Sequence, residues 1–358
     1  AAQGVDMTGL SVEECADISG DGSTIIGNGV SGGTDTTYLI RDAGITTAAG
    51  LEQSLAELSA VAADISYMAM GTMRAIMDQA DHLPEPGTSR MWMVGSLLGD
   101  VMGGDGGGDG GGEGGIGFSL PLSPGLVLGT GLFMGRRSVD LRFDGRQTSV
   151  LFGPGAFLSY APERYGWRMK VGALYERASL DLDRGYPNGG GTAVAEGSTD
   201  GSVLSLSGHL GYIHPLTPVL AVQPYAEYDL QAMILDPYTE TDTPFPAHFE
   251  ERRDVMGKAR LGAQLRYSAS QDLDVWGWGA WSHRFDDKGA SMDGHLVGLN
   301  EFSYGGADID KDWAEVGGGV KYRSDEGPEV FTRATFAVDN ERYAAPDIAL
   351  NAGVSWSF

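Results

Sequence analysis

The feature that most constrains the fold is the alternation of apolar and polar residues from about Arg90 to Phe358. In the segment 258–267, one face carries Leu261, Ala263, Leu265 and Tyr267, and the other carries Lys258, Arg260, Gly262, Gln264 and Arg266. The segment 167–176 repeats the pattern, with Arg168, Lys170 and Glu176 on its polar face. A period of two residues predicts strands with one apolar and one polar face.

The connections between these strands are predicted to alternate in length. Short turns are predicted at residues 122–125, 161–166, 216–218, 270–272 and 325–328. Long acidic or glycine-rich loops are predicted at residues 103–115, 184–201, 239–254 and about 286–312. Tight turns at one end and long loops at the other are typical of an outer-membrane β-barrel, and roughly 22 residues per strand with its connection predict about 12 antiparallel strands.

The chain ends on the alternating segment LNAGVSWSF, residues 350–358. A barrel in lipid must leave no strand edge, so this last strand is expected to pair with the first one, near RMWMVGSLLG at residues 90–99. Phe358 is then expected to face lipid at the periplasmic interface, where aromatic residues gather.

A different period precedes the strands, in residues 46–82. Apolar residues recur there at three- and four-residue steps: Leu51, Leu55, Leu58, Ala62, Ile65, Ala69, Met73 and Ile76. This predicts a helix that Thr46 or Thr47 caps and that the sequence LPEPG ends. Glu52, Asp64 and Arg74 make it too polar for lipid, whereas its many alanines suit a narrow pore. It is therefore expected to thread the lumen, with Leu55, Ala62, Ala69 and Arg74 as pore-helix residues. The alternative is an amphipathic helix that packs on a soluble domain or on partner chains.

The composition excludes several classes of function. The net charge is -25, and nucleic acid requires a basic surface. Cys15 is the single cysteine, so no intrachain disulfide can form. The sequence shows no run of eighteen apolar residues, and its N-terminus lacks the basic start and apolar core of an intact signal peptide.

Five segments carry a resemblance to a known family: VQPYAEYDL (222–230), WGWGAWSHRF (276–285), VGLNEFSYGG (297–306), WAEVGGGVKY (313–322) and NAGVSWSF (351–358). Over roughly residues 50–358 the chain resembles the translocator β-domain of type Va autotransporters. The resemblance implies a bacterial outer-membrane barrel that takes part in bringing an N-terminal passenger to the cell surface, with the helix left in the pore as a linker. The implied partners are the passenger, the barrel-assembly machinery, periplasmic chaperones and outer-membrane lipid.

The same resemblance implies a division of the chain. Residues 1–45 are similar to short repeats with a DGS-x-(I/V)-x-G pattern and would be a passenger remnant at the cell surface, 46–85 the linker and 86–358 the barrel. The ending fits the assembly signal of the family at Asn351, Gly353, Trp356 and Phe358. Some family members cut the linker through an asparagine pair. No asparagine lies between Asn28 and Asn188, so an uncleaved linker is expected.

Two other functions are compatible with a barrel. One is a diffusion porin, which would lack a helix in its pore. The other is an omptin-like protease, for which Asp286, Asp287 and His295 are the nearest candidates for paired catalytic groups. The six histidines show no metal-ligand spacing, and no G-x-S-x-G elbow occurs. No catalytic, metal or cofactor site is therefore predicted.

Overall fold

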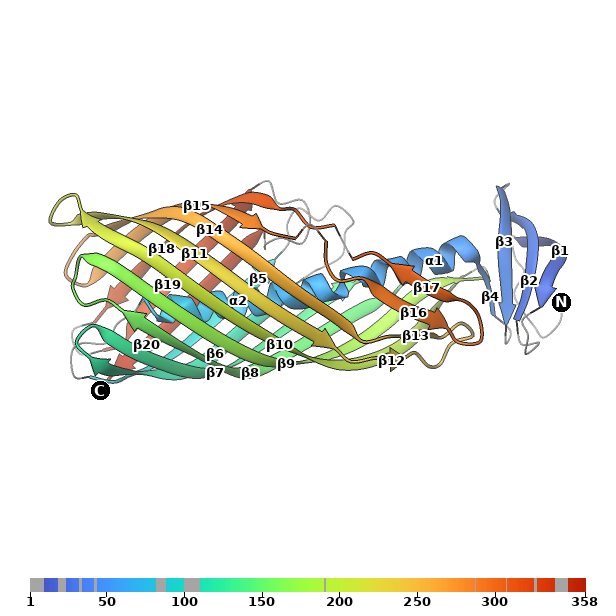
Figure 1. Cartoon of the computed structure of the whole chain (residues 1–358), viewed down its shortest axis with the longest axis horizontal. Coiled ribbons are helices and arrows are strands. Elements are labelled where there is room, and N and C mark those ends of the chain that lie inside the picture. Colours follow the sequence, from blue (N-terminus) through green and yellow to red (C-terminus); the bar gives the residue numbers. More distant parts are fainter. Residues whose placement is uncertain are drawn as a thin grey trace.

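The computed structural model describes residues 10–18, 24–31, 34–41, 44–81, 88–99, 110–189, 191–286, 288–306, 308–324, 327–338 and 347–358. Twelve of the strands in these ranges close an antiparallel barrel, which confirms the predicted fold class and strand number (Figure 1). In barrel order they are β5 (Arg90–Gly99), β6 (Gly110–Ser123), β7 (Leu126–Asp140), β8 (Arg146–Tyr160), β9 (Gly166–Asn188), β10 (Gly191–Pro215), β11 (Leu220–Leu235), β14 (Arg252–Ser268), β15 (Leu273–Arg284), β18 (Asp312–Arg323), β19 (Glu329–Val338) and β20 (Ile348–Ser357).

The first and last strands close the barrel, as the sequence predicted. The β20–β5 ladder runs from Ile348 opposite Gly99 to Ser357 opposite Arg90. Beyond it, the Phe358 amide donates to the Ser89 carbonyl oxygen at 2.9 Å, and the Ser89 amide donates back at 3.0 Å. The ladder is therefore continuous around the wall, which is what the bilayer core requires of spanning strands.

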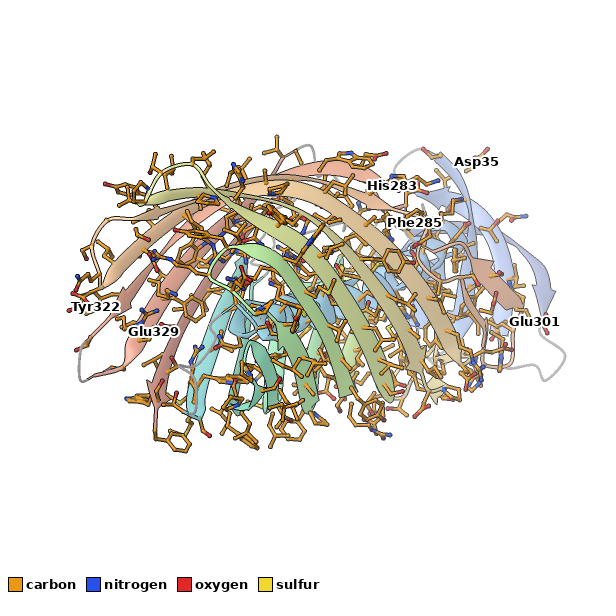
Figure 2. All side chains as sticks on the ribbon, turned by 60° about the vertical axis from the view of Figure 1, so that its left-hand side comes forward. Asp35, His283, Phe285, Glu301, Tyr322 and Glu329 are labelled. Atoms are coloured by element: carbon orange, nitrogen blue, oxygen red, sulfur yellow. The ribbon has the colours of Figure 1, made fainter. Side chains whose placement is uncertain are left out.

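The predicted alternation sorts side chains between the two faces of the wall. Leu261, Leu265 and Tyr267 are exposed on the outside, whereas Lys258 and Arg260 are buried in the lumen. Exposed aromatic rings gather near the short turns, including Tyr160, Trp167, Tyr212, Tyr267 and Tyr322. Figure 2 shows Tyr322 toward one end of the barrel and Phe285 toward the other. Aromatic residues at both ends of an apolar band match the two interfaces of a bilayer.

The second part of the helical segment runs lengthwise inside the barrel, and the first part continues beyond it beside the extended end of β9 (Figure 1). It consists of α1 (Ala48–Glu57), the 3₁₀ turn η2 (Leu58–Ala60) and α2 (Val61–Gln79). The Thr47 hydroxyl accepts from the Gly50 amide at 3.0 Å, so Thr47 is the cap. The 3₁₀ turn was not predicted, and the Arg252 guanidinium donates to the carbonyl oxygens of Leu58 and Ser59 there.

Within the described ranges, no helix combines the length and the apolar character needed to span a membrane.

All four predicted long loops are wrong in part. Residues 184–201 continue β9 and β10, whose ladder reaches Asn188 opposite Gly191. Residues 110–115 of the predicted glycine loop belong to β6, and residues 100–109 lie outside the described ranges. The segments 239–254 and 286–312 contribute strands to a small sheet, which we call the cap sheet, in the order β12 (Tyr238–Thr239), β13 (Ala247–Phe249), β16 (Met292–Leu296) and β17 (Glu301–Tyr304). Glycine and polar residues on both faces of these extensions hid their strand character.

A second four-stranded sheet precedes the helix. Its strands are β1 (Leu10–Ile18), β2 (Thr24–Ser31), β3 (Thr34–Arg41) and β4 (Gly44–Thr47), paired in chain order. Figure 1 places this sheet at one end of the molecule and the C-terminus at the other. The four short turns that the structure describes in full, 124–125, 161–165, 216–219 and 269–272, agree with the predicted turns.

Candidate functional site: the filled pore

Wall glycines allow the helix to come close to the barrel. An added Cβ at Gly155 of β8 would lie 2.5 Å from Cδ1 of Ile76. At Gly172 of β9 it would lie 2.8 Å from the Met77 sulfur, closer than real Cβ atoms come to any neighbour. The sequence predicted that small helix residues would let the helix fit a narrow pore. The structure adds a second means of close packing, because large helix side chains occupy the space that wall glycines leave free.

Glu315 is the centre of a polar network in the lumen. Its carboxylate, which is fully buried, accepts from Arg74 of the helix at 2.7 Å and from Arg260 of β14 at 3.3 Å. Ser282 Oγ and Trp313 Nε1 each donate to its other oxygen at 3.0 Å. A buried carboxylate with two cations and two further donors has its charge and its lone pairs matched, which is the condition for a stable buried ion pair.

The network continues along the wall through a second carboxylate. Glu227 of β11 lies 2.5 Å from Arg260 and 3.3 Å from His209 Nδ1. Lys258 pairs with Asp229 at 3.2 Å. The guanidinium of Arg260 thus bridges Glu227 of β11 and Glu315 of β18. Because Glu315 also pairs with Arg74, these strands are linked to the helix.

Cations surround the end of the helix nearest the short turns. Lys170 Nζ lies 2.9 Å from Asp81 and donates to the Met77 carbonyl oxygen at 3.3 Å. Arg333 pairs with Asp78. The Ser159 hydroxyl donates to the Ala80 carbonyl oxygen at 2.8 Å. Such groups satisfy terminal carbonyls and suit the negative end of the helix dipole.

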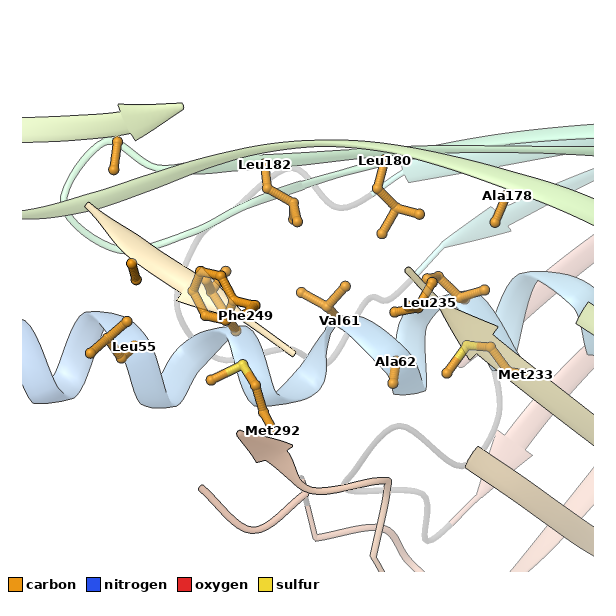
Figure 3. Close-up of a cluster of buried hydrophobic side chains, with 14 of the residues drawn as sticks. Leu55, Val61, Ala62, Ala178, Leu180, Leu182, Met233, Leu235, Phe249 and Met292 are labelled. Carbon is orange, nitrogen blue, oxygen red and sulfur yellow. The ribbon is translucent and has the colours of Figure 1, made fainter. Parts of the chain in front are cut away.

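At the loop end, the cap sheet and β9 hold the first half of the helix. Arg184 of β9 donates to Glu240 at 2.8 and 2.6 Å, and to Ser54 Oγ of α1 at 2.9 Å. Figure 3 shows the apolar cluster beside this pair, where Leu55 and Val61 of the helix lie among side chains of β9 and the cap sheet: Leu180, Leu182, Phe249 and Met292.

A further contact fixes the end of α1 to the β7–β8 loop. Both carboxylate oxygens of Glu57 accept from the Arg142 amide at 3.1 Å. Burial raises the pKa of the Glu57 carboxyl above its ordinary value, although the amide and the charge of Arg142 act in the opposite direction.

The structure places each site residue that was named from the sequence. Leu55, Ala62 and Ala69 are buried in the helix, and Arg74 contacts Glu315. Lys170, Lys258 and Arg260 face the lumen in ion pairs, and Arg266 lies 4.0 Å from Asp81. Arg168 donates to the Arg164 carbonyl oxygen, and Glu176 is buried beside Thr72. At the C-terminus, Asn351 is buried and Gly353 faces inward, whereas Trp356 and Phe358 are exposed.

The sequence analysis missed the acidic partners of these cations. Glu227 and Glu315 lie in the segments VQPYAEYDL and WAEVGGGVKY, in which alternation would have assigned them to the lumenal face. Arg184 and Glu240 were missed because both were predicted to lie in loops.

The lumen between the helix and strands β10, β11 and β14 is almost filled, whereas a second cavity of about 1050 Å³ lies along strands β5–β7 and β18–β20. The cavity between α2 and strands β10, β11 and β14 has a volume of about 50 Å³, which holds only a few water molecules. Charged side chains and the methionines of α2 line it, including Met70, Met73, Lys258 and Arg260.

The residues considered for a protease have other partners. Asp286 accepts from Arg284 Nε at 2.7 Å, and the His295 ring lies 5.0 Å from the His248 ring in the cap sheet. Asp287 lies outside the described residues. Among the residues that the structure describes, no group of three or more His, Cys, Asp or Glu side chains is arranged to hold a metal ion.

A closed barrel with an apolar outer face, and with a polar helix of its own chain fixed in the lumen, defines a transmembrane translocator whose pore is occupied. The family model described as the autotransporter beta-domain matches residues 99–335. The chain belongs to that family, and it is the translocator domain of an autotransporter.

Solved structures share the fold of this chain. The chain is similar to the translocator domain of autotransporter NalP from Neisseria meningitidis, with a TM-score of 0.68 and 15% identity over 85% of this chain and 99% of that one. It is also similar to the beta domain of the Bordetella autotransporter BrkA, with a TM-score of 0.50 and 15% identity over 76% of this chain and 99% of that one. No curated protein sequence matches the chain.

Proposed function

We propose that this domain takes part in bringing its own N-terminal passenger to the cell surface and then anchors it there through the helix that remains in the pore. Residues 1–45 are then the C-terminal remnant of the passenger, 46–85 the linker and 86–358 the barrel. The observation that best supports this is the attachment of the helix along its whole length: Ser54 contacts Arg184, Arg74 contacts Glu315, and Asp81 contacts Lys170.

The proposal gives each end of the barrel a side of the outer membrane. The short turns and the C-terminus face the periplasm, and the long hairpins, the cap sheet and β1–β4 face outward, as in other outer-membrane barrels. Asn351, Gly353, Trp356 and Phe358 then form the signal that the assembly machinery binds, with periplasmic chaperones as earlier partners. The lumenal residues Arg168, Lys170, Glu176, Lys258, Arg260 and Arg266 serve as the polar lining against which the linker moves and finally rests.

Single-channel conductance tests the occupied pore. The full chain in planar bilayers is expected to show only small, rare openings. A variant without residues 48–79 is expected to show wide, stable ones. A variant without residues 10–41 is the control, because it removes a segment of similar size and leaves the helix in place. Wide openings in the full chain that do not change on helix deletion would favour a diffusion porin and contradict the proposal.

Surface exposure of the passenger remnant tests export itself. An epitope placed before residue 10 is expected to react with antibody on intact cells and to disappear when external protease is added. An epitope in the turn 161–166 should stay protected until the membrane is opened. An N-terminal epitope that is accessible only from the periplasm overturns the proposed direction of transport.

A further inference from the structure

A wide cavity opens at the short-turn end of the barrel, below the end of the helix. Its volume is about 810 Å³. Ala80 and Asp81 form its roof, and its sides come from the turn-proximal ends of the strands, including Ser159, Ile213 and Gln264. We call it the turn-end vestibule. Among the residues that the structure describes, this end of the lumen is wider than the space between the helix and strands β10, β11 and β14.

The charge of the turn-end vestibule is opposite to that of the chain. Its described lining residues include seven basic ones, Arg164, Arg168, Lys170, Arg266, Lys321, Arg323 and Arg333, and three acidic ones, Asp78, Asp81 and Asp274. The whole sequence has 24 basic and 49 acidic residues. A concave site lined mainly by cations concentrates the positive potential and attracts anionic groups to that end of the pore.

Most of these cations lie in ion pairs, whereas Arg168 is near the charge of Asp81 without forming an ion pair among the described residues. Lys170 and Arg333 hold the end of the helix, while Lys321 and Arg323 lie 3.9 and 3.2 Å from Glu329. Within the described ranges, no ion pair involves Arg164 or Arg168.

Two guanidinium groups at this end of the barrel have hydrogen-bond donors without acceptors. Arg168 Nη2 donates to the Arg164 carbonyl oxygen at 2.8 Å, but its Nη1 is buried without a hydrogen-bond partner. Nε of the neighbouring Arg266 is buried and without a partner as well. Buried guanidinium donors without acceptors are costly, and a carboxylate is the acceptor whose geometry matches them.

The segment upstream of the helix has the complementary charge. Residues 1–45 contain seven acidic residues, Asp6, Glu13, Glu14, Asp17, Asp21, Asp35 and Asp42, and one basic residue, Arg41. A cavity of this volume accommodates a stretch of polypeptide rather than a single small ion.

We propose that the turn-end vestibule is a binding site for acidic polypeptide, with Arg164 and Arg168 as its main contacts, and that it captures the passenger as the chain enters the pore. This inference rests on the proposed function. The interaction is electrostatic and partly exposed, so it weakens as salt increases and lets the chain move on.

Binding of a labelled deca-glutamate peptide to the full chain in detergent micelles tests the site directly. Fluorescence anisotropy is expected to show binding that weakens with added salt, and about ten-fold weaker binding to the double variant Arg164→Gln/Arg168→Gln. The control double variant Arg177→Gln/Arg253→Gln removes the same charge from exposed positions away from the vestibule and should bind like the unmodified chain. If both double variants bind deca-glutamate equally well, the proposal is overturned. It is also overturned if the unmodified chain binds deca-lysine as tightly as deca-glutamate. If inorganic phosphate at the same concentration of charge displaces the peptide, the vestibule is a site for simple anions, and the proposal is overturned.

Export kinetics in cells complete the test. The Arg164→Gln/Arg168→Gln variant is expected to expose the N-terminal epitope several-fold more slowly, while heat-modifiable migration shows an unchanged folded barrel. Changing Glu13, Glu14 and Asp17 to their amides should slow export similarly, and the combined variant should be no slower than either. If the combined variant exports more slowly than either parent variant, by the sum of the two effects, the two sets of residues do not act through one contact and the proposal is overturned. If the unmodified chain exports nothing, the proposed function fails; if it exports normally and the peptide does not bind, this inference alone fails.

Discussion

At the scale of single residues, a few lumenal carboxylates decide how firmly the helix is held. Glu315 is the clearest case, because one buried side chain joins the helix, β14, β15 and β18 through Arg74, Arg260, Ser282 and Trp313. Removing one partner of a buried ion pair costs more than the pair itself contributes, because the remaining charge stays buried.

We therefore expect Glu315→Gln to loosen the helix at its centre. The loss is about 3 kcal/mol, at the low end for a broken buried pair because Arg260 keeps Glu227. The measurement is trypsin cleavage after Arg74 in the folded protein, together with the frequency of channel openings. Glu163→Gln in an exposed turn is the control. An unchanged cleavage rate at Arg74 would show that this network does not retain the helix.

Phe358 supports a second prediction at this scale. Its side chain is 76% exposed, so deletion removes little packing and takes from the finished wall only the last pair of backbone hydrogen bonds, with Ser89. Deleting Phe358 is expected to lower the yield of inserted barrel several-fold while leaving the urea midpoint of the inserted protein within experimental error. Phe336→Ala, which shortens another exposed aromatic on β19, should leave the yield unchanged. Unchanged yield after Phe358 deletion excludes a role for this residue in the assembly signal.

At the scale of elements, the cap sheet and the helix depend on each other. Arg184 and Glu240 are both about 1% exposed, and Arg184 also contacts Ser54 of α1 and the Phe245 carbonyl oxygen. Glu240→Gln leaves the guanidinium without its counter-ion, which favours separation of β12–β13 from β9.

Hydrogen exchange should detect this separation. In Glu240→Gln, amides of β13 and α1 are expected to exchange at least ten-fold faster, whereas amides in the β7–β8 ladder keep their rates. Glu251→Gln, whose parent side chain pairs only with exposed Arg253 among the described residues, is the matched control. Equal protection of α1 in both variants would rule out the cap sheet as a clamp on the helix.

Elements could be predicted from the sequence where their apolar residues follow a clear period. The segment 258–267 was predictable because each outward residue must meet lipid, and the helix was predictable from its period. The ends of β9 and β10 within residues 184–201 were not predictable, because a strand that extends beyond the lipid does not need an apolar face. Within the site, the cations were named, but Arg168 and Lys170 could not be distinguished: only the fold shows that Lys170 forms an ion pair with Asp81, whereas Arg168 Nη1 is buried without a hydrogen-bond partner.

At the scale of the whole molecule, the barrel and its linker are expected to stay one polypeptide. No asparagine occurs from residue 29 to residue 187, so the linker cannot be cut by asparagine cyclisation. Mass spectrometry of the purified folded protein should show one full-length species after days without added protease. A spontaneous break within residues 50–82 contradicts this prediction, and its position would identify the bond that is cut.

The attachment of the helix also has a mechanical consequence. An outward pull on β1–β4 passes through Thr47 into the helix axis and reaches the wall as shear at Ser54, Arg74, Asp78 and Asp81. Contacts loaded in shear share the force, so no single ion pair has to resist it alone. The barrel wall cannot open along a strand edge under this load, because the β20–β5 ladder closes it. In the proposed orientation, these lateral contacts together hold the passenger remnant to the barrel.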